Sequence, residues 1–248
     1  MKAIFVAAVL AGGNWSLMPG QALRASQEET VWLPDGKTDS HTIQLTRGAN
    51  GTLAVHPVHI AGDRMDHSGA TYFYLLDLQE GFFYTGDTHV GLAYRTRLPY
   101  DEAAKAYSLD DIKRQYVENQ FGDCSVLTRA QGKAAQTDEV FGYDVVLVEA
   151  VENKERRTAW LAPDLGCFPL RREVRDGEEE LSVRAETTSV EILPSQTRVA
   201  LPTGIRLVSP KAYCAQYKAV YGVDFLPAKS CAALEAQYGR YAPSRAAR

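Results

Sequence analysis

The sequence lacks the features that mark several large protein classes. Its main apolar run, Ala3–Ala11, is too short to span a bilayer. There is no basic stripe and the formal net charge is −4, so nucleic acid is not an expected partner. Internal repeats and low-complexity linkers are missing as well. With 45% apolar residues among 248, the chain is instead typical of a globular protein that buries a core of its own.

Motifs of the common enzyme classes are also missing. The sequence has no G-x-S-x-G nucleophile elbow, no H-E-x-x-H zinc motif and no glycine-rich phosphate loop. Five possible metal ligands lie close together: His56, His59, Asp63, Asp66 and His67. Strand positions three apart point to opposite faces, and Pro57 disfavours a regular strand, so this spacing does not suit a metal. We therefore expect no enzymatic activity, no catalytic residue, no metal site and no cofactor.

Residues 1–22 have the layout of a secretory signal peptide. A short basic start precedes the apolar segment Ala3–Ala11, and Gly20 and Ala22 supply the small residues before a cleavage site. A buried first strand of the domain is the alternative. No cysteine adjoins the cleavage site, so a lipid anchor is not indicated. We expect the mature chain, 23–248, in a periplasm or outside the cell, with no transmembrane segment.

The four cysteines all lie in the expected mature chain, which favours disulfides in an exported protein. Cys214–Cys231 is the favoured pair, because it closes a short loop between two helical patterns. Cys124–Cys167 is then the second bond. The other connectivities, and four buried free thiols, remain open. No C-x-x-C pair is present, which argues against a zinc site.

Alternating patterns and hairpin signals such as Asn50-Gly51 predict an antiparallel sheet. The expected strands are Glu28–Trp32, His41–Thr46, Thr52–Ile60, Ala70–Leu78, Phe82–Tyr84, Val90–Tyr94, Cys124–Arg129, Tyr143–Glu149, Arg157–Ala162, Phe168–Val174 and Leu181–Ile192. Ala70–Leu78 is apolar on both of its faces, which indicates a strand that is covered on both sides.

Two regions outside these strands have a different period. Apolar residues recur at helical spacing over Tyr100–Gln120, which predicts one helix or two short helices that meet at a second N-cap, Ser108 followed by Asp110-Asp111. Val199–Gly204 is expected to be an edge or exit strand. Ser209 and Pro210 then begin a helix, and Ala212–Tyr221 and Cys231–Tyr238 form a helical pair. The order predicts an α+β fold, a large antiparallel sheet with helices on one side.

The stretch from Tyr143 to Arg172 resembles the outer-membrane lipoprotein carrier family, LolA and LolB. There, a strand ending in a Trp-x-x-Asp-type turn is followed by a strand that opens with Pro-Leu and a basic residue. The matching residues here are Trp160, Asp164, Pro169, Leu170 and Arg171. The turn is longer in this chain, and the C-terminal cysteine pair is extra. The resemblance implies an unclosed β-barrel, a curved sheet with helices on its concave side and acyl chains received between them.

Aromatic and basic residues are the candidate contacts. The aromatic residues that could line a lipophilic site are Tyr72, Tyr74, Phe82, Tyr84, Tyr94 and Trp160, although core packing is the favoured explanation of the aromatic cluster. The pairs Arg156-Arg157 and Arg171-Arg172 could form a basic patch for an anionic head group or an acidic partner; cross-strand pairing with Glu149, Glu155 and Glu173 is the alternative.

The leading functional hypothesis is an exported, non-enzymatic protein that binds a lipid or lipidated ligand, such as a lipoprotein, between sheet and helices. Residues 23–205 would form the sheet domain, with 206–248 a helical extension packed on it. The alternative is a periplasmic protein–protein interaction or sensor module of the same fold with a filled core and no ligand.

Overall fold

The computed structural model describes residues 22–33, 35–48, 52–56, 71–110, 113–114, 117, 120–122, 137–152, 154–177, 180–226 and 228–241. Several expected features lie outside these residues. They are the signal peptide up to residue 21, the strand Cys124–Arg129, Cys124 itself, and the possible metal ligands beyond His56.

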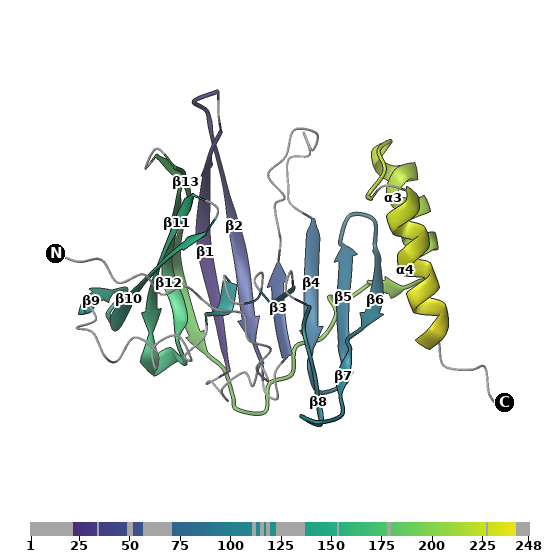
Figure 1. Ribbon diagram of the computed structural model, residues 1–248, viewed down its shortest axis with the longest axis horizontal. Coiled ribbons are helices and arrows are strands. Elements are labelled where there is room, and N and C mark those ends of the chain that lie inside the picture. Colours follow the sequence, from purple (N-terminus) through teal and green to yellow (C-terminus); the bar gives the residue numbers. More distant parts are fainter. Residues whose placement is uncertain are drawn as a thin grey trace.

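Twelve strands form one unclosed sheet (Figure 1), in the order β14-β6-β5-β4-β3-β2-β1-β13-β12-β11-β10-β9. Neighbouring strands are antiparallel except for β14 and β6. Their bounds are β1 Leu23–Trp32, β2 Thr38–Arg47, β3 Thr52–His56, β4 Tyr72–Asp77, β5 Phe82–Asp87, β6 Leu92–Arg97, β9 Thr137–Val140, β10 Tyr143–Glu152, β11 Glu155–Ala162, β12 Phe168–Arg175, β13 Leu181–Ile192 and β14 Arg206–Leu207. A short 3₁₀ helix, η2 Pro163–Leu165, links β11 to β12. The expected α+β architecture is confirmed.

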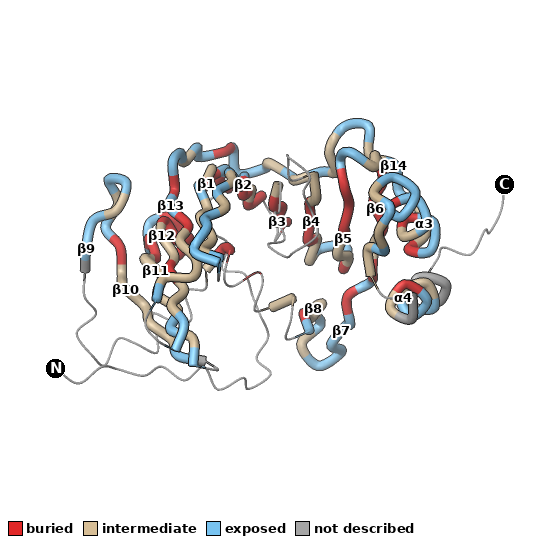
Figure 2. The backbone as a smooth tube through the Cα atoms, turned by 90° about the horizontal axis from the view of Figure 1, so that it is seen from above, coloured by how far each residue is buried: buried red, intermediate tan, exposed pale blue. Residues whose placement is uncertain are grey.

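The sheet carries its main core on one face, which we call the inner face. Its central strands contribute Leu23, Ala25, Ile43, Leu45, Leu53, Val55, Tyr74 and Leu76, all at most 2% exposed. Cross-strand register places these residues side by side, as in the pairs Ala25–Leu45 and Leu45–Val55. Figure 2 shows that the sheet bends, so that strands at its two ends turn toward the same side. The inner face is therefore the concave one.

The cover of the inner face comes from the chain that follows β6. Leu98, Leu109, Val117 and Phe121 of this segment belong to the same buried cluster as the central strands. The helix expected over Tyr100–Gln120 is wrong in its first half, because Tyr100–Asp101 (β7) and Ala106–Tyr107 (β8) form a hairpin. Helical backbone occurs only after Asp110, whose carboxylate accepts a hydrogen bond from the Lys113 amide as an N-cap.

The opposite, outer face is crossed by the chain between β13 and β14. Val199 and Leu201 pack there on Ala54, Leu75 and Tyr84, which are buried beneath them. The strand expected over Val199–Gly204 is therefore wrong: these residues cover the outer face as irregular chain, and the edge strand β14 comes later. A strand with apolar residues on both faces, as expected for β4, needs both of these covers.

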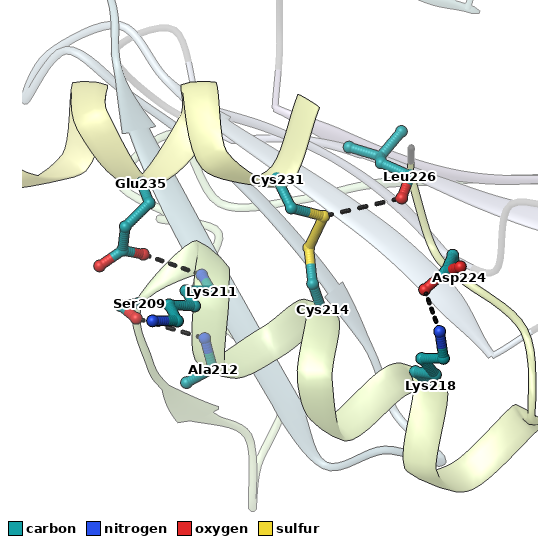
Figure 3. The surroundings of a disulfide bond; sticks show 9 residues. All are labelled: Ser209, Lys211, Ala212, Cys214, Lys218, Asp224, Leu226, Cys231 and Glu235. Carbon is teal, nitrogen blue, oxygen red and sulfur yellow. Dashed lines mark hydrogen bonds and ion pairs between the residues drawn. A yellow bond between two sulfur atoms is a disulfide. The ribbon is translucent and has the colours of Figure 1, made fainter. Parts of the chain in front are cut away.

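Two C-terminal helices pack beyond β6. The first, α3 Pro210–Tyr221, starts as expected, with Ser209 accepting a hydrogen bond from the Ala212 amide and Pro210 in first position. The second, α4 Ala228–Tyr241, is joined to it by the expected Cys214–Cys231 disulfide (Figure 3). Cys167 is also disulfide-bonded. No helix among the described residues is both long and apolar enough to cross a membrane.

We predict that the double variant Cys214→Ala/Cys231→Ala loses about 3 kcal/mol of unfolding free energy, because the bond closes a loop with a sequence separation of 17. Urea unfolding under non-reducing conditions, followed by circular dichroism, measures the change. The double variant is preferable to a reducing agent, since reduction would also open the bond at Cys167. An unchanged unfolding midpoint would show that helix packing alone holds the pair.

Candidate functional site on the inner face

The inner face combines a fully buried apolar centre with a partly exposed apolar border. Eight further apolar residues pack against the buried cluster while staying only half-buried: Tyr72, Leu78, Phe83, Tyr107, Val140, Tyr143, Trp160 and Val190. They come from strands along the sheet and from the β7–β8 hairpin. Such a border is a feature of places where an apolar surface can accept a partner or ligand.

The six aromatic residues proposed from the sequence are divided between the two faces. Tyr72 and Tyr74 lie on the inner face, and the register pair Thr85–Tyr94 puts Tyr94 there as well. Phe82 and Tyr84 lie on the outer face, under the chain around Val199. Phe82 and Tyr84 therefore cannot line the same site as the three inner-face tyrosines.

Trp160, the sixth aromatic residue, borders the main core on β11. The guanidinium carbon of Arg171 lies 4.6 Å from the centre of its ring. Trp160 packs against the main buried cluster, but the register pairs it with Arg171, whose side chain points to the face opposite Arg172. It does not lie beside Tyr72 and Tyr94, because β1, β2 and β13 are among the strands between them.

The inner face of β6 is occupied by the C-terminal helices. Tyr94 and Leu92 form a cluster with Tyr213 and Tyr217 of α3, and Phe225 packs against it. The buried carboxylate of Asp87 accepts hydrogen bonds of 2.9 Å from the hydroxyls of Tyr221 and Thr71. Burial, together with this carboxylate, raises the pKa of Tyr221 to about 12. The helix pair thus closes this end of the inner face with aromatic packing and a polar bond.

A polar network lies on the inner face where β12, β13, β1 and β2 meet. The Arg172 Nη2 donates to Gln120 Oε1 at 3.1 Å, to Glu29 Oε2 at 3.2 Å and to Gln27 Oε1 at 3.4 Å. The other oxygen of Glu29 is 3.4 Å from His41 Nε2. The side chains of Arg172, Glu29 and His41 are only 14%, 16% and 11% exposed.

The register explains why these charged groups point into the core. Glu29 pairs with His41, and the next inward pairs are Gln27–Ile43 and Ala25–Leu45, so the network continues directly into the apolar centre. Gln27 is completely buried and also donates to the Pro169 carbonyl at 2.7 Å. Gln120 belongs to the segment that covers the face. The network therefore joins the cover to the sheet.

The charges of the network determine the ionisation of Glu29. Burial alone raises the pKa of this carboxyl, but the interaction with His41 and the positive charge of Arg172 outweigh it, so its pKa lies below the ordinary value. The carboxylate and guanidinium are both charged at neutral pH. Burying such a pair is costly and contributes little net stability, which makes it a candidate for a functional role.

A second buried arginine on the inner side has a structural role. Arg47 of β2 donates to the Leu165 and Gly166 carbonyls at the end of η2. Burial lowers its pKa to about 10, so it remains a cation at neutral pH. These carbonyls match the arginine's donors and fix the turn between β11 and β12 against β2.

The basic pairs expected to form one patch are divided as well. On the outer face, Arg171, Arg175 and Arg184 surround Glu173 at 2.6, 3.1 and 3.0 Å. Arg171 and Arg175 pair with Glu173 along their own strand, and Arg184 of β13 pairs with it across strands, whereas Arg172 points inward to the network. Among the described residues, no three histidine, cysteine, aspartate or glutamate side chains gather into a possible metal site.

The network could not be recognised in the sequence because the expected first strand begins at Glu28, within the observed strand β1. The observed β1 begins at Leu23, and counting by twos from there places Gln27 and Glu29 on the same face as Leu23 and Ala25. Polar residues at inward positions of a strand are a recognisable signal once the strand boundary is known.

Comparison with known proteins gives structural likenesses at low sequence identity. A LolA superfamily protein from Nitrosomonas europaea matches with 10% identity and a TM-score of 0.30, over 73% of this chain and 91% of that one. MucB in its complex with MucA from Pseudomonas aeruginosa matches with 11% identity and a TM-score of 0.35, over 69% of this chain and 51% of that one.

PNGF-II matches with 11% identity and a TM-score of 0.42 over 76% of this chain, which spans only 31% of the PNGF-II chain. The family to which Tyr143–Arg172 is similar is thus among the structural matches. All three likenesses concern the arrangement of strands. No family model matches the sequence, and no curated protein matches it either.

We predict that Glu29→Gln reduces the amount of unfolding free energy that the protein loses when the pH falls from neutral to acid. Because the folded-state pKa of Glu29 lies below its unfolded value, its contribution is present above about pH 4.5 and is lost as the pH falls through the folded-state pKa. Urea unfolding at a series of pH values should show a smaller acid loss for the variant than for the wild type.

Glu28→Gln is the matched control, since Glu28 is the exposed neighbour on the same strand and faces the other side. Identical pH dependence of Glu29→Gln and the wild type would contradict the described charge network.

Proposed function

We propose that this protein is a non-enzymatic binding protein that holds the apolar chain of a lipid or lipidated ligand on the inner face of its sheet. The observation that carries the proposal is the half-buried apolar border around the buried centre of that face. An apolar chain bound there would leave water and contact hydrocarbon groups. Burial of its apolar surface would contribute about 25 cal/mol of binding free energy per Å², from which the entropy cost of ordering the chain is subtracted.

The way in which the inner face is covered supports the proposal. β7 and β8 form a two-stranded sheet of their own. The segment that contains them packs on the large sheet through apolar side chains such as Leu98 and Phe121. Within the described part of that segment, Gln120 accepts a side-chain hydrogen bond from Arg172 of β12, and the Tyr107 hydroxyl accepts one from Arg97 of β6. A cover attached in this way can shift to admit a ligand without breaking strand pairing.

The Cys214–Cys231 disulfide supports the expected location. Disulfides persist mainly in oxidising compartments, so we infer that the protein works in the periplasm or outside the cell. Residues 206–248 would act there as an extension of the sheet domain, because α3 packs its tyrosines directly on β6.

A protein–protein interaction module with a filled core is the second candidate. It is favoured by the tight packing at the centre of the inner face, where Leu23, Leu45, Leu53, Val55 and Leu76 are 0% exposed. In that case the same half-buried border would contact a protein and no apolar chain would enter.

Two adjacent residues of β5 provide a matched test. Phe83 borders the inner core and Phe82 packs on the outer face, and both are half-buried. We predict that Phe83→Ser weakens binding of the neutral probe pyrenedodecanol about fivefold or more, since it removes an aromatic contact worth roughly 1 kcal/mol, whereas Phe82→Ser leaves binding unchanged. Fluorescence titration of the full chain measures both affinities.

Circular dichroism and thermal unfolding establish that each variant is folded before titration. Failure of the wild type to bind the probe, or equal weakening by the two variants, would contradict a ligand site on the inner face. The filled-core interaction module would then be the better account.

A further inference from the structure

Arg172 has more hydrogen-bond donors than its neighbours use. Its bonds to Gln120, Glu29 and Gln27 all leave from Nη2, whose two protons are shared among three acceptors at 3.1 to 3.4 Å. Nε is buried without a hydrogen-bond partner, and no described residue accepts a bond from Nη1. A guanidinium has five donors, so this one keeps capacity for another acceptor.

The position of Arg172 suits a ligand with one polar end. Glu29 and His41, its neighbours, form the register pair that precedes Gln27–Ile43 and Ala25–Leu45 along β1 and β2. A group bound to the guanidinium would thus lie at the boundary between the network and the apolar centre. The acceptor that occupies Nη2 at the shortest distance, Gln120, is neutral and belongs to the cover.

We propose that Arg172 recognises an anionic end group, a carboxylate or a phosphate, of an amphipathic ligand whose apolar chain lies along the inner face. The inference rests on the proposed function and adds the chemistry of the ligand's head to it. When Gln120 turns away, Nη2 and Nη1 form an edge of two donors, which binds a carboxylate or phosphate bidentately.

The carboxylate of Glu29 does not prevent this binding. It holds one side of Nη2 at 3.2 Å through Oε2, while its Oε1 faces His41 at 3.4 Å. Glu29 therefore fixes the guanidinium in place rather than enclosing it.

The test compares three probes with the same apolar chain: pyrenedodecanol, pyrenedodecanoic acid and pyrenedodecyl phosphate. We expect the full-length wild type to bind one or both anionic probes about tenfold more tightly than the alcohol, the scale of one charged hydrogen-bonding contact. Arg172→Gln should bind all three probes alike, at the affinity of the alcohol. Whichever anionic probe binds more tightly identifies the head group.

Two further variants keep the result interpretable. Arg184→Gln removes an arginine that is paired with Glu173 on the outer face of the same sheet, and it should keep the preference for anions. The double variant Glu29→Gln/Arg172→Gln leaves no unpaired charge in the network, so it should stay folded and still lack the preference if the single variant is unstable.

The outcomes separate this inference from the proposed function. Equal binding of all probes by the wild type, or a preference that persists in Arg172→Gln or in the double variant, would overturn the role of Arg172 while the apolar site stands. Failure of every probe to bind would overturn the proposed function itself.

Discussion

Packing of the concave face of the sheet against chain that lies outside the sheet is the interaction on which the rest of the structure depends. An unclosed sheet leaves that face without a second layer of strands, so its leucines and valines must be covered by the segment around Phe121 and by the C-terminal helices. The order of the elements serves this need. The chain leaves the sheet after β6, covers the centre, returns as β9 to β13, and finally places α3 and α4 beyond β6.

A charged network within such a face requires an explanation, because buried ion pairs rarely add net stability. Glu29 lies at an inward position of β1, where Leu23 and Ala25 of the same strand show that apolar residues fit, and Arg172 points to the same face from β12. A binding protein for amphipathic molecules would use this combination, an apolar floor for the chain and a charged group for the head. The outer face instead surrounds the buried carboxylate of Glu173 with Arg171, Arg175 and Arg184, whose side chains are 32–35% exposed, so that each of these arginines keeps contact with water.

Much of the fold could be predicted from the sequence because the informative signals are local. Hairpin turns and alternation gave most strands, and Ser209-Pro210 gave the start of α3. The hairpin at Tyr100–Tyr107 could not be predicted in this way, since its tyrosines recur at a spacing that fits a helix, and only packing on the inner face decides between the two. The network depends on which face each residue of β1 points to, and on contacts between residues more than 140 positions apart, such as Arg172 and Glu29. No local pattern encodes either of these.

Organic extraction and mass spectrometry of the full chain, purified without detergent, test the central claim most directly. The account predicts a stoichiometric amphipathic molecule with an apolar chain and an anionic end group. Protein that is purified under these mild conditions and yields no such molecule would contradict the account, and the inner face would then be a filled core.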